Sequence, residues 1–153
     1  MKAKTIATVM LSLFVAVSVV VMVAKELHAP ASTGAPIANV PHQVIVYYFH
    51  GMMRCDACRR IEAYTKKALD SAFAPALADG RLEWRVVNRD EPAHEHFASD
   101  YKLKTQSAVV IADYRYGRQT AWKELESVAN LVDDEAAFVS YVQLETRVLL
   151  ETP

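Results

Sequence analysis

The sequence is poor in the residues that mark several large classes of protein. Of its 153 residues only two are cysteine and four are glycine, and 17 basic side chains nearly balance 18 acidic ones. Because no basic stripe is available to neutralise phosphates, the chain is not expected to bind nucleic acid. No flavin or dinucleotide fingerprint is present either, so we expect no bound organic cofactor.

One segment has no charge at all. The 20 consecutive residues from Thr5 to Ala24 (TIATVMLSLFVAVSVVVMVA) are uncharged. As a helix they would span about 30 Å, the thickness of the hydrocarbon core of a bilayer. Lys2 and Lys4 precede the run, so the positive-inside rule keeps the N-terminus in the cytoplasm. Residues 1–26 therefore predict a single N-terminal transmembrane helix.

The alternative for this segment is a cleaved signal peptide. The apolar region of a signal peptide usually has only about 7–15 residues and ends at a small-x-small site. The candidate sites here, Met22-Val23-Ala24 and Leu27-His28-Ala29, each begin with a bulky residue. An uncleaved anchor is favoured, and the signal peptide stays open. Both would place the following domain on the periplasmic or extracellular side of the cytoplasmic membrane.

Residues 27–42 form the expected linker, and residues 43–153 form one expected domain. The linker holds three prolines and small residues without a periodic apolar face, which is typical of a semi-extended spacer. A domain of about 110 residues buries roughly 65% of the surface of its unfolded chain. Such a domain needs no disulfide to fold.

Seven segments of the domain predict regular structure. Strands are expected at 43–49, 81–88, 107–113 and 118–124, and helices at 55–73, at 92–101 and from about 133 onward. Strands and helices alternate first, which calls for parallel pairing, and a closing hairpin at Tyr116-Gly117 adds an antiparallel edge. The prediction is an α/β fold with a central mixed four-stranded sheet flanked by helices.

Side-chain patterns predict which faces are buried. Between Arg81 and Asn88, Leu82, Trp84 and Val86 alternate with charged residues, which predicts the second strand. In the last helix the expected buried residues are Phe138, Tyr141, Val142 and Leu149, and Glu145 interrupts their stripe.

The two cysteines form the motif that carries chemistry. Cys55-Asp56-Ala57-Cys58 follows a buried strand and opens a helix, where the free N–H groups favour a thiolate. We expect Arg54, Arg59 and Arg60 to lower the pKa of the Cys55 thiol further, against the effect of Asp56. The spacing lets the second thiol resolve a mixed disulfide on the first.

Three interpretations of the pair are open. Dithiol–disulfide exchange is favoured. A soft-metal site would use Cys55 and Cys58 with Met52, Met53 or His50, a donor set that suits Cu(I). An inert disulfide would close so small a loop that it constrains the unfolded chain little.

His50 precedes the pair and is a candidate for assisting proton transfer, or simply a histidine that finds a hydrogen-bond partner. His94 and His96 diverge around a helix and make a poor chelate.

Four segments carry a resemblance to a known family. These are YYFHGMMRCDACRRIE, RLEWRVVNRDEP, TQSAVVI and WKELESVANLVDDEAAFVSYV. The chain resembles, over about 44–148, the thioredoxin-like proteins called the nitrophenyl compound nitroreductase subunit ArsF family. The resemblance implies a thioredoxin-like fold with Cys55 and Cys58 as the redox pair. It also implies a redox partner of the multi-spanning membrane electron-carrier type. Because the chain shows no flavin or dinucleotide fingerprint, we expect it to hand electrons onward instead of reducing nitro groups itself.

The sequence also differs from ordinary thioredoxins. Residues 104–107 lack the proline that those proteins hold before the third strand, no tryptophan precedes Cys55, and Phe49 stands where they keep a buried acid. These differences indicate a narrow choice of partner. The expected function is a membrane-anchored extracytoplasmic thiol–disulfide oxidoreductase or electron relay. The alternative is a soft-metal or arsenical binding module that uses the same two thiols.

Overall fold

The computed structural model describes residues 41–152. The expected anchor at 1–26 and the linker up to residue 40 lie outside the described residues. Within 41–152, no helix is both long enough and apolar enough to cross a membrane. The elements in chain order are β1 (His42–His50), α2 (Asp56–Ala72), α3 (Ala74–Ala78), β2 (Leu82–Asn88), α4 (His96–Asp100), β3 (Ala108–Arg115), β4 (Arg118–Glu124), α5 (Val128–Leu131) and α6 (Glu135–Glu151).

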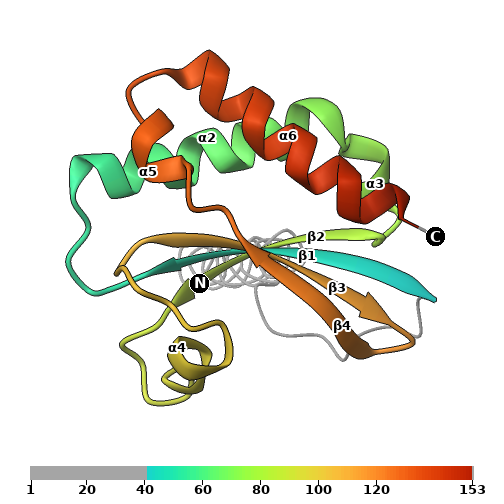
Figure 1. The fold of residues 1–153 in the computed structure, drawn as a ribbon, viewed down its shortest axis with the longest axis horizontal. Helices are drawn as coiled ribbons and strands as arrows, with labels where there is room; N and C mark the ends of the chain where they lie inside the picture. Colours follow the sequence, from blue (N-terminus) through green and yellow to red (C-terminus); the bar gives the residue numbers. More distant parts are fainter. Residues whose placement is uncertain (1–40, 153) are drawn as a thin grey trace, which may run out of the picture. The chain divides into compact units, whose positions relative to one another are not determined.

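The four strands form one mixed sheet in the order β2-β1-β3-β4 (Figure 1). β1 pairs in parallel with β2 and antiparallel with β3, and β3 pairs antiparallel with β4. The predicted four-stranded mixed sheet flanked by helices is therefore confirmed, and its connections are those of the expected thioredoxin-like architecture. β1 lies in the interior of the sheet with a neighbour on each side.

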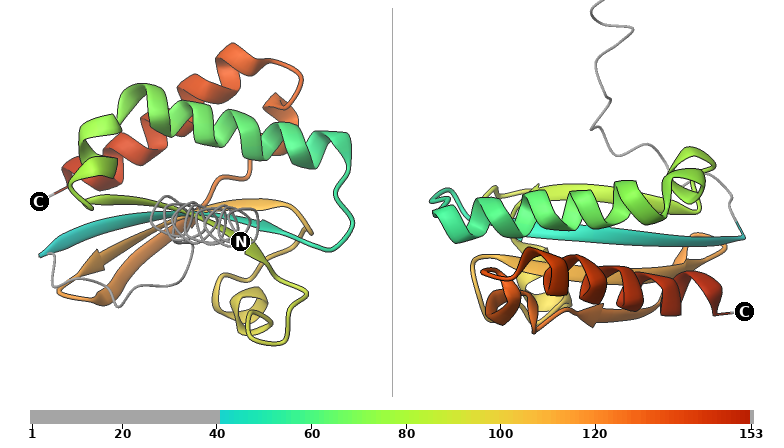
Figure 2. Two further views of the ribbon diagram at one scale, coloured as in Figure 1. Left: turned by 180° about the vertical axis from the view of Figure 1, so that it is seen from behind. Right: turned by 90° about the horizontal axis from the view of Figure 1, so that it is seen from above.

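Helices cover both faces of this sheet. α2 and α6 lie side by side across one face, while α4 lies on the other (Figures 1 and 2). Successive side chains of a strand point to opposite faces, so β1 contributes to both cores. Val44, Val46 and Tyr48 belong to the core under α2 and α6, whereas Ile45, Tyr47 and Phe49 belong to the core on the α4 side.

Local chemistry explains where the hairpin and the last helix begin. Tyr116 and Gly117 have φ angles of 50° and 76°, the left-handed pair that a two-residue hairpin turn requires. The predicted tight turn is thus confirmed. At the start of α6 the Asp134 carboxylate accepts a hydrogen bond from the Ala137 amide at 3.0 Å, which satisfies one of the free donors of the first turn.

The helix predicted after β2 is present but begins later than expected. The helix expected at 92–101 shortens to α4, because the residues before it form turns with i to i+3 hydrogen bonds, such as His94 N to Glu91 O at 2.8 Å. Val86 is 43% exposed, and its neighbour Val87 is buried instead. Val87 points to the other face of the edge strand β2, where it packs into the α4-side core.

The buried stripe of α6 differs in part from the prediction. Phe138 and Val142 are buried as expected, but the third buried position is Thr146, while Tyr141 and Leu149 are only half-buried. Glu145 is not part of the buried stripe. Its Oε2 atom lies 2.6 Å from Nζ of Lys123 in β4, and the two side chains form an ion pair. The short helices α3 and α5 were not predicted, since four or five residues are too few to show a helical period.

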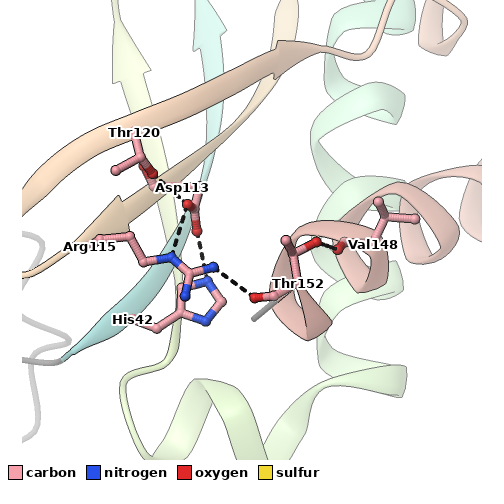
Figure 3. A network of polar contacts seen from close by, with 6 residues as sticks. All are labelled: His42, Asp113, Arg115, Thr120, Val148 and Thr152. Atoms are coloured by element: carbon pink, nitrogen blue, oxygen red, sulfur yellow. Dashed lines mark hydrogen bonds and ion pairs between the residues drawn. The ribbon is translucent and has the colours of Figure 1, made fainter.

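A polar network fastens the start of β1 to the closing hairpin (Figure 3). Asp113 is 7% exposed and accepts hydrogen bonds from His42 at 2.7 Å and Arg115 at 3.2 Å, and also from Thr120. Thr120 lies opposite the register shift between β3 and β4. Burial raises the pKa of Asp113, but the hydrogen bonds from Thr120, Arg115 and His42 outweigh it, so the pKa lies below its ordinary value.

We predict that Asp113→Asn lowers the free energy of unfolding by about 2 kcal/mol near neutral pH, because charge-assisted hydrogen bonds are lost in a buried setting. A carboxylate with a lowered pKa stabilises the fold above its ordinary pKa, and this contribution is lost as the pH falls through the folded-state value. Denaturant unfolding at about pH 7 and about pH 3 should therefore show the difference from the parent shrinking in acid.

The matched control is Asp133→Asn, which removes an exposed carboxylate that pairs with Arg60 at 2.9 Å. Its effect should stay below about 1 kcal/mol. If Asp113→Asn lowers the free energy of unfolding by the same amount at both pH values, the lowered pKa assigned to Asp113 is wrong.

Candidate functional site

Cys55 and Cys58 are joined in a disulfide at the point where the chain enters α2. Cys55 is the N-cap residue, with extended backbone, and its Sγ accepts a hydrogen bond from the Cys58 amide at 3.1 Å. Cys55 is exposed and Cys58 is half-buried. In the reduced form, the same amide and the helix N-terminus favour a thiolate on Cys55 over one on Cys58.

The three arginines near the pair do not act equally. Arg54 forms an ion pair with Glu62, and both side chains are partly buried. Arg60 is paired with Asp133. Arg59 alone of the three has no ion pair within the described residues. Arg54 and Arg60 are thus each paired with a carboxylate, which weakens the expected effect of both on the Cys55 thiol.

A buried tyrosine lies beneath the second cysteine. The Tyr48 hydroxyl donates a hydrogen bond to the Cys58 carbonyl at 2.7 Å, and the Ser107 hydroxyl donates to Tyr48 Oη at 3.0 Å. The Tyr48 side chain is fully buried. The sequence reasoning missed this contact. The alternation of β1 was the available signal, because it places Tyr48 on the same sheet face as α2.

Phe49, which stands where thioredoxins keep a buried acid, points away from the pair. Its ring packs 5.2 Å from that of Phe97 and 5.6 Å from that of Tyr101, in the core on the α4 side. The polar group that contacts the cysteine-bearing turn from β1 is the Tyr48 hydroxyl.

The loop before Cys55 is held by the residues that follow β2. The Met52 amide donates to Asp90 Oδ2 at 2.8 Å, and the Arg89 amide donates to the His50 carbonyl at 2.9 Å. A Cβ at Gly51 would lie 2.9 Å from Asp90 Oδ2, so the loop approaches Asp90 more closely than a side chain allows. The guanidinium of Arg89 also donates to the Thr105 carbonyl at 2.6 Å. Nothing in the sequence pattern pointed to Arg89 or Asp90.

The methionines and histidines that were considered as metal ligands differ in their surroundings. Met52 and Met53 lie beside the pair in sequence and their side chains are 78% and 84% exposed. His50 donates from Nδ1 to the Gly51 carbonyl at 2.9 Å when that nitrogen carries the proton. His94 and His96 bond elsewhere, to the Asn88 carbonyl at 3.0 Å and to Asp100 at 2.8 Å.

No protein-family model matches the chain, and no curated protein matches it significantly. Solved structures do. A mutant thioredoxin from Entamoeba histolytica is 20% identical over 67% of this chain and 81% of its own, with a TM-score of 0.40. Fasciola hepatica thioredoxin is 19% identical over 65% of this chain and 81% of its own, with a TM-score of 0.36. Malaria-parasite thioredoxin-2 is 20% identical over 62% of this chain and 85% of its own, with a TM-score of 0.37.

We predict that the two thiols of the reduced protein react at different rates. Cys55 is exposed at the helix N-terminus and Cys58 is half-buried one turn later, so pulse alkylation should modify Cys55 first. Its reaction should persist well below the free-thiol pKa of about 8.5, because the helix N-terminus stabilises the thiolate. Peptide mapping after a short pulse at several pH values is the measurement. Equal rates at the two thiols would reverse the assignment of roles.

Proposed function

We propose that the chain is a thiol–disulfide oxidoreductase or electron relay in which Cys55 exchanges with a partner and Cys58 resolves the mixed disulfide. One observation carries the proposal: the disulfide spans the first turn of α2 with one exposed and one half-buried cysteine. This arrangement makes Cys55 the more accessible of the two sulfurs to a partner. It also keeps the second thiol within reach for the unimolecular step.

A purely structural role fits the same disulfide poorly. The two cysteines are three positions apart, and closing so short a loop removes little entropy from the unfolded chain. The domain already has two apolar cores, one on each face of the sheet. The disulfide is therefore placed where it contributes little to stability and is open to exchange.

We extend the proposal to place and partner. The uncharged run from Thr5 to Ala24 supports a single-pass anchor in the cytoplasmic membrane with the domain on the outer side. β1 begins at His42, so a linker over residues 27–41 would hold the domain close to other membrane proteins. The resemblance to the ArsF family supports a multi-spanning membrane electron carrier as the redox partner.

A second candidate function is soft-metal or arsenical binding by the reduced pair. The observation that favours it is the exposure of Met52 and Met53, at 78% and 84%, immediately before the cysteines. Thioether and thiolate sulfurs together suit Cu(I). In this function the two thiols would be ligands, and no exchange with a partner would be needed.

We predict that Cys58→Ser accumulates a mixed disulfide through Cys55 when it is expressed in its native membrane. Without the resolving thiol, the intermolecular bond has no intramolecular route to release. The matched variant Cys55→Ser should trap little, because Cys58 is half-buried. Non-reducing gel electrophoresis with identification of the attached protein is the measurement.

Two results would change the proposal. Trapping through Cys58 in place of Cys55 would exchange the two roles. If neither variant traps a protein and the reduced parent binds Cu(I) or As(III) tightly, metal binding replaces disulfide exchange as the function.

We also predict that the full chain stays in the membrane fraction after alkaline carbonate washing, since an uncharged run of this length is held by the hydrocarbon core. A protease added outside the cytoplasm should digest the C-terminal domain. Replacing two central residues, Phe14→Lys and Val15→Lys, should release the chain from the membrane, because each charge at the centre costs about 3 kcal/mol. Recovery of a soluble form that begins near Lys25 or Pro30 would show that the run is a cleaved signal peptide.

A further inference from the structure

We propose that the Tyr48 hydroxyl positions Cys58 for the resolving step, and that Ser107 fixes the direction of this hydroxyl. The inference rests on the proposed function and concerns its second chemical step. Tyr48 belongs to β1, Cys58 to α2 and Ser107 to the segment before β3, so the contact joins three parts of the chain.

The two hydrogen bonds allow only one direction for the proton of the Tyr48 hydroxyl. A tyrosine hydroxyl has a single proton to donate and can accept in return. Ser107 Oγ donates to Tyr48 Oη at 3.0 Å, so the tyrosine proton is directed to the Cys58 carbonyl at 2.7 Å. The Tyr48 ring is fully buried and stacks on Trp84, with 6.4 Å between centroids. The hydroxyl therefore has no route to solvent, and its donor bond goes to the cysteine-bearing turn.

This bond matters most when the disulfide is open. In the oxidised protein the covalent bond itself holds the two cysteines, with their Cα atoms 5.0 Å apart. Once Cys55 is bonded to a partner, that restraint on Cys58 is gone. The hydrogen bond from Tyr48 then remains to hold the backbone of Cys58 against the sheet. A small misplacement of a reacting group slows an intramolecular step strongly.

The step itself balances without a further reagent. The Cys58 thiol loses its proton to solvent, and the thiolate attacks Cys55 Sγ. The Cys55–Cys58 bond forms as the mixed disulfide breaks, and the partner sulfur leaves with the electron pair as a thiolate that solvent protonates. The two cysteines are oxidised and the partner is reduced. Tyr48 exchanges no proton in this scheme and acts only by position.

The test separates the two steps with dithiobis(nitrobenzoate) as the disulfide. Mixing it with the reduced full chain releases one thionitrobenzoate when Cys55 attacks and a second when Cys58 resolves. Tyr48→Phe removes one oxygen atom and keeps the buried ring. We expect the first release to keep its parental rate and the second to slow about fivefold, as the loss of one neutral hydrogen bond implies. Ser107→Ala should slow the second release by a smaller factor.

The matched control is Tyr64→Phe, which removes the same atom from a tyrosine of α2. The centroid of the Tyr64 ring lies 5.6 Å from that of Phe138. Both of its release rates should be parental. If Tyr48→Phe slows both steps equally, or leaves the second step unchanged, the positioning role is wrong. Should Tyr48→Phe fail to fold, Ser107→Ala provides the test. Slowing of its second release alone supports the positioning role, and an unchanged second release contradicts it.

The outcome also separates this inference from the function on which it rests. If the reduced parent ends with a thionitrobenzoate group in a mixed disulfide on each cysteine and no intramolecular disulfide, disulfide exchange by the pair is wrong. If the parent closes its disulfide and Tyr48→Phe closes it at the same rate, only the role of Tyr48 is wrong.

Discussion

The structure depends on the burial of β1 on both faces. The side chains from Val44 to Phe49 are between 0% and 2% exposed, and the strand is hydrogen-bonded to β2 on one side and β3 on the other. Burial of six large apolar or aromatic side chains is a large favourable contribution, of about 1.5–3 kcal/mol each. This constraint fixes where the strand ends, at His50, and so fixes where the loop to Cys55 begins.

The chemistry of the site is an extension of this packing. Because β1 alternates between faces, Tyr48 lies under α2 while Phe49 joins the aromatic core on the α4 side. The Tyr48 hydroxyl reaches the first turn of α2, and Asp90 and Arg89 hold the loop above it through backbone groups. The disulfide is thus carried by a rigid helix start, with only the outer cysteine exposed. Rigid support of this kind is what a unimolecular resolving step requires.

Much of the fold was predictable because its signals are local. The apolar run of β1, the turn at Tyr116-Gly117 and the acidic start of α6 each act within a few residues, and the structure confirms all three. The site was predictable only as far as the cysteine motif. Tyr48 and Ser107 are 59 positions apart, and such a contact has no period that a sequence displays. The exposure of Val86 could not be predicted from the alternation of its strand for a related reason, since exposure on an edge strand depends on which helix covers it.

The central claim is that Cys55 and Cys58 form a disulfide that opens and closes in function. Its reduction potential tests this most directly, measured by equilibrating the full chain with glutathione or dithiothreitol buffers and counting free thiols. We expect a potential between about −270 and −120 mV, the range of dithiol oxidoreductases. A potential below about −300 mV is typical of structural disulfides and would contradict the claim.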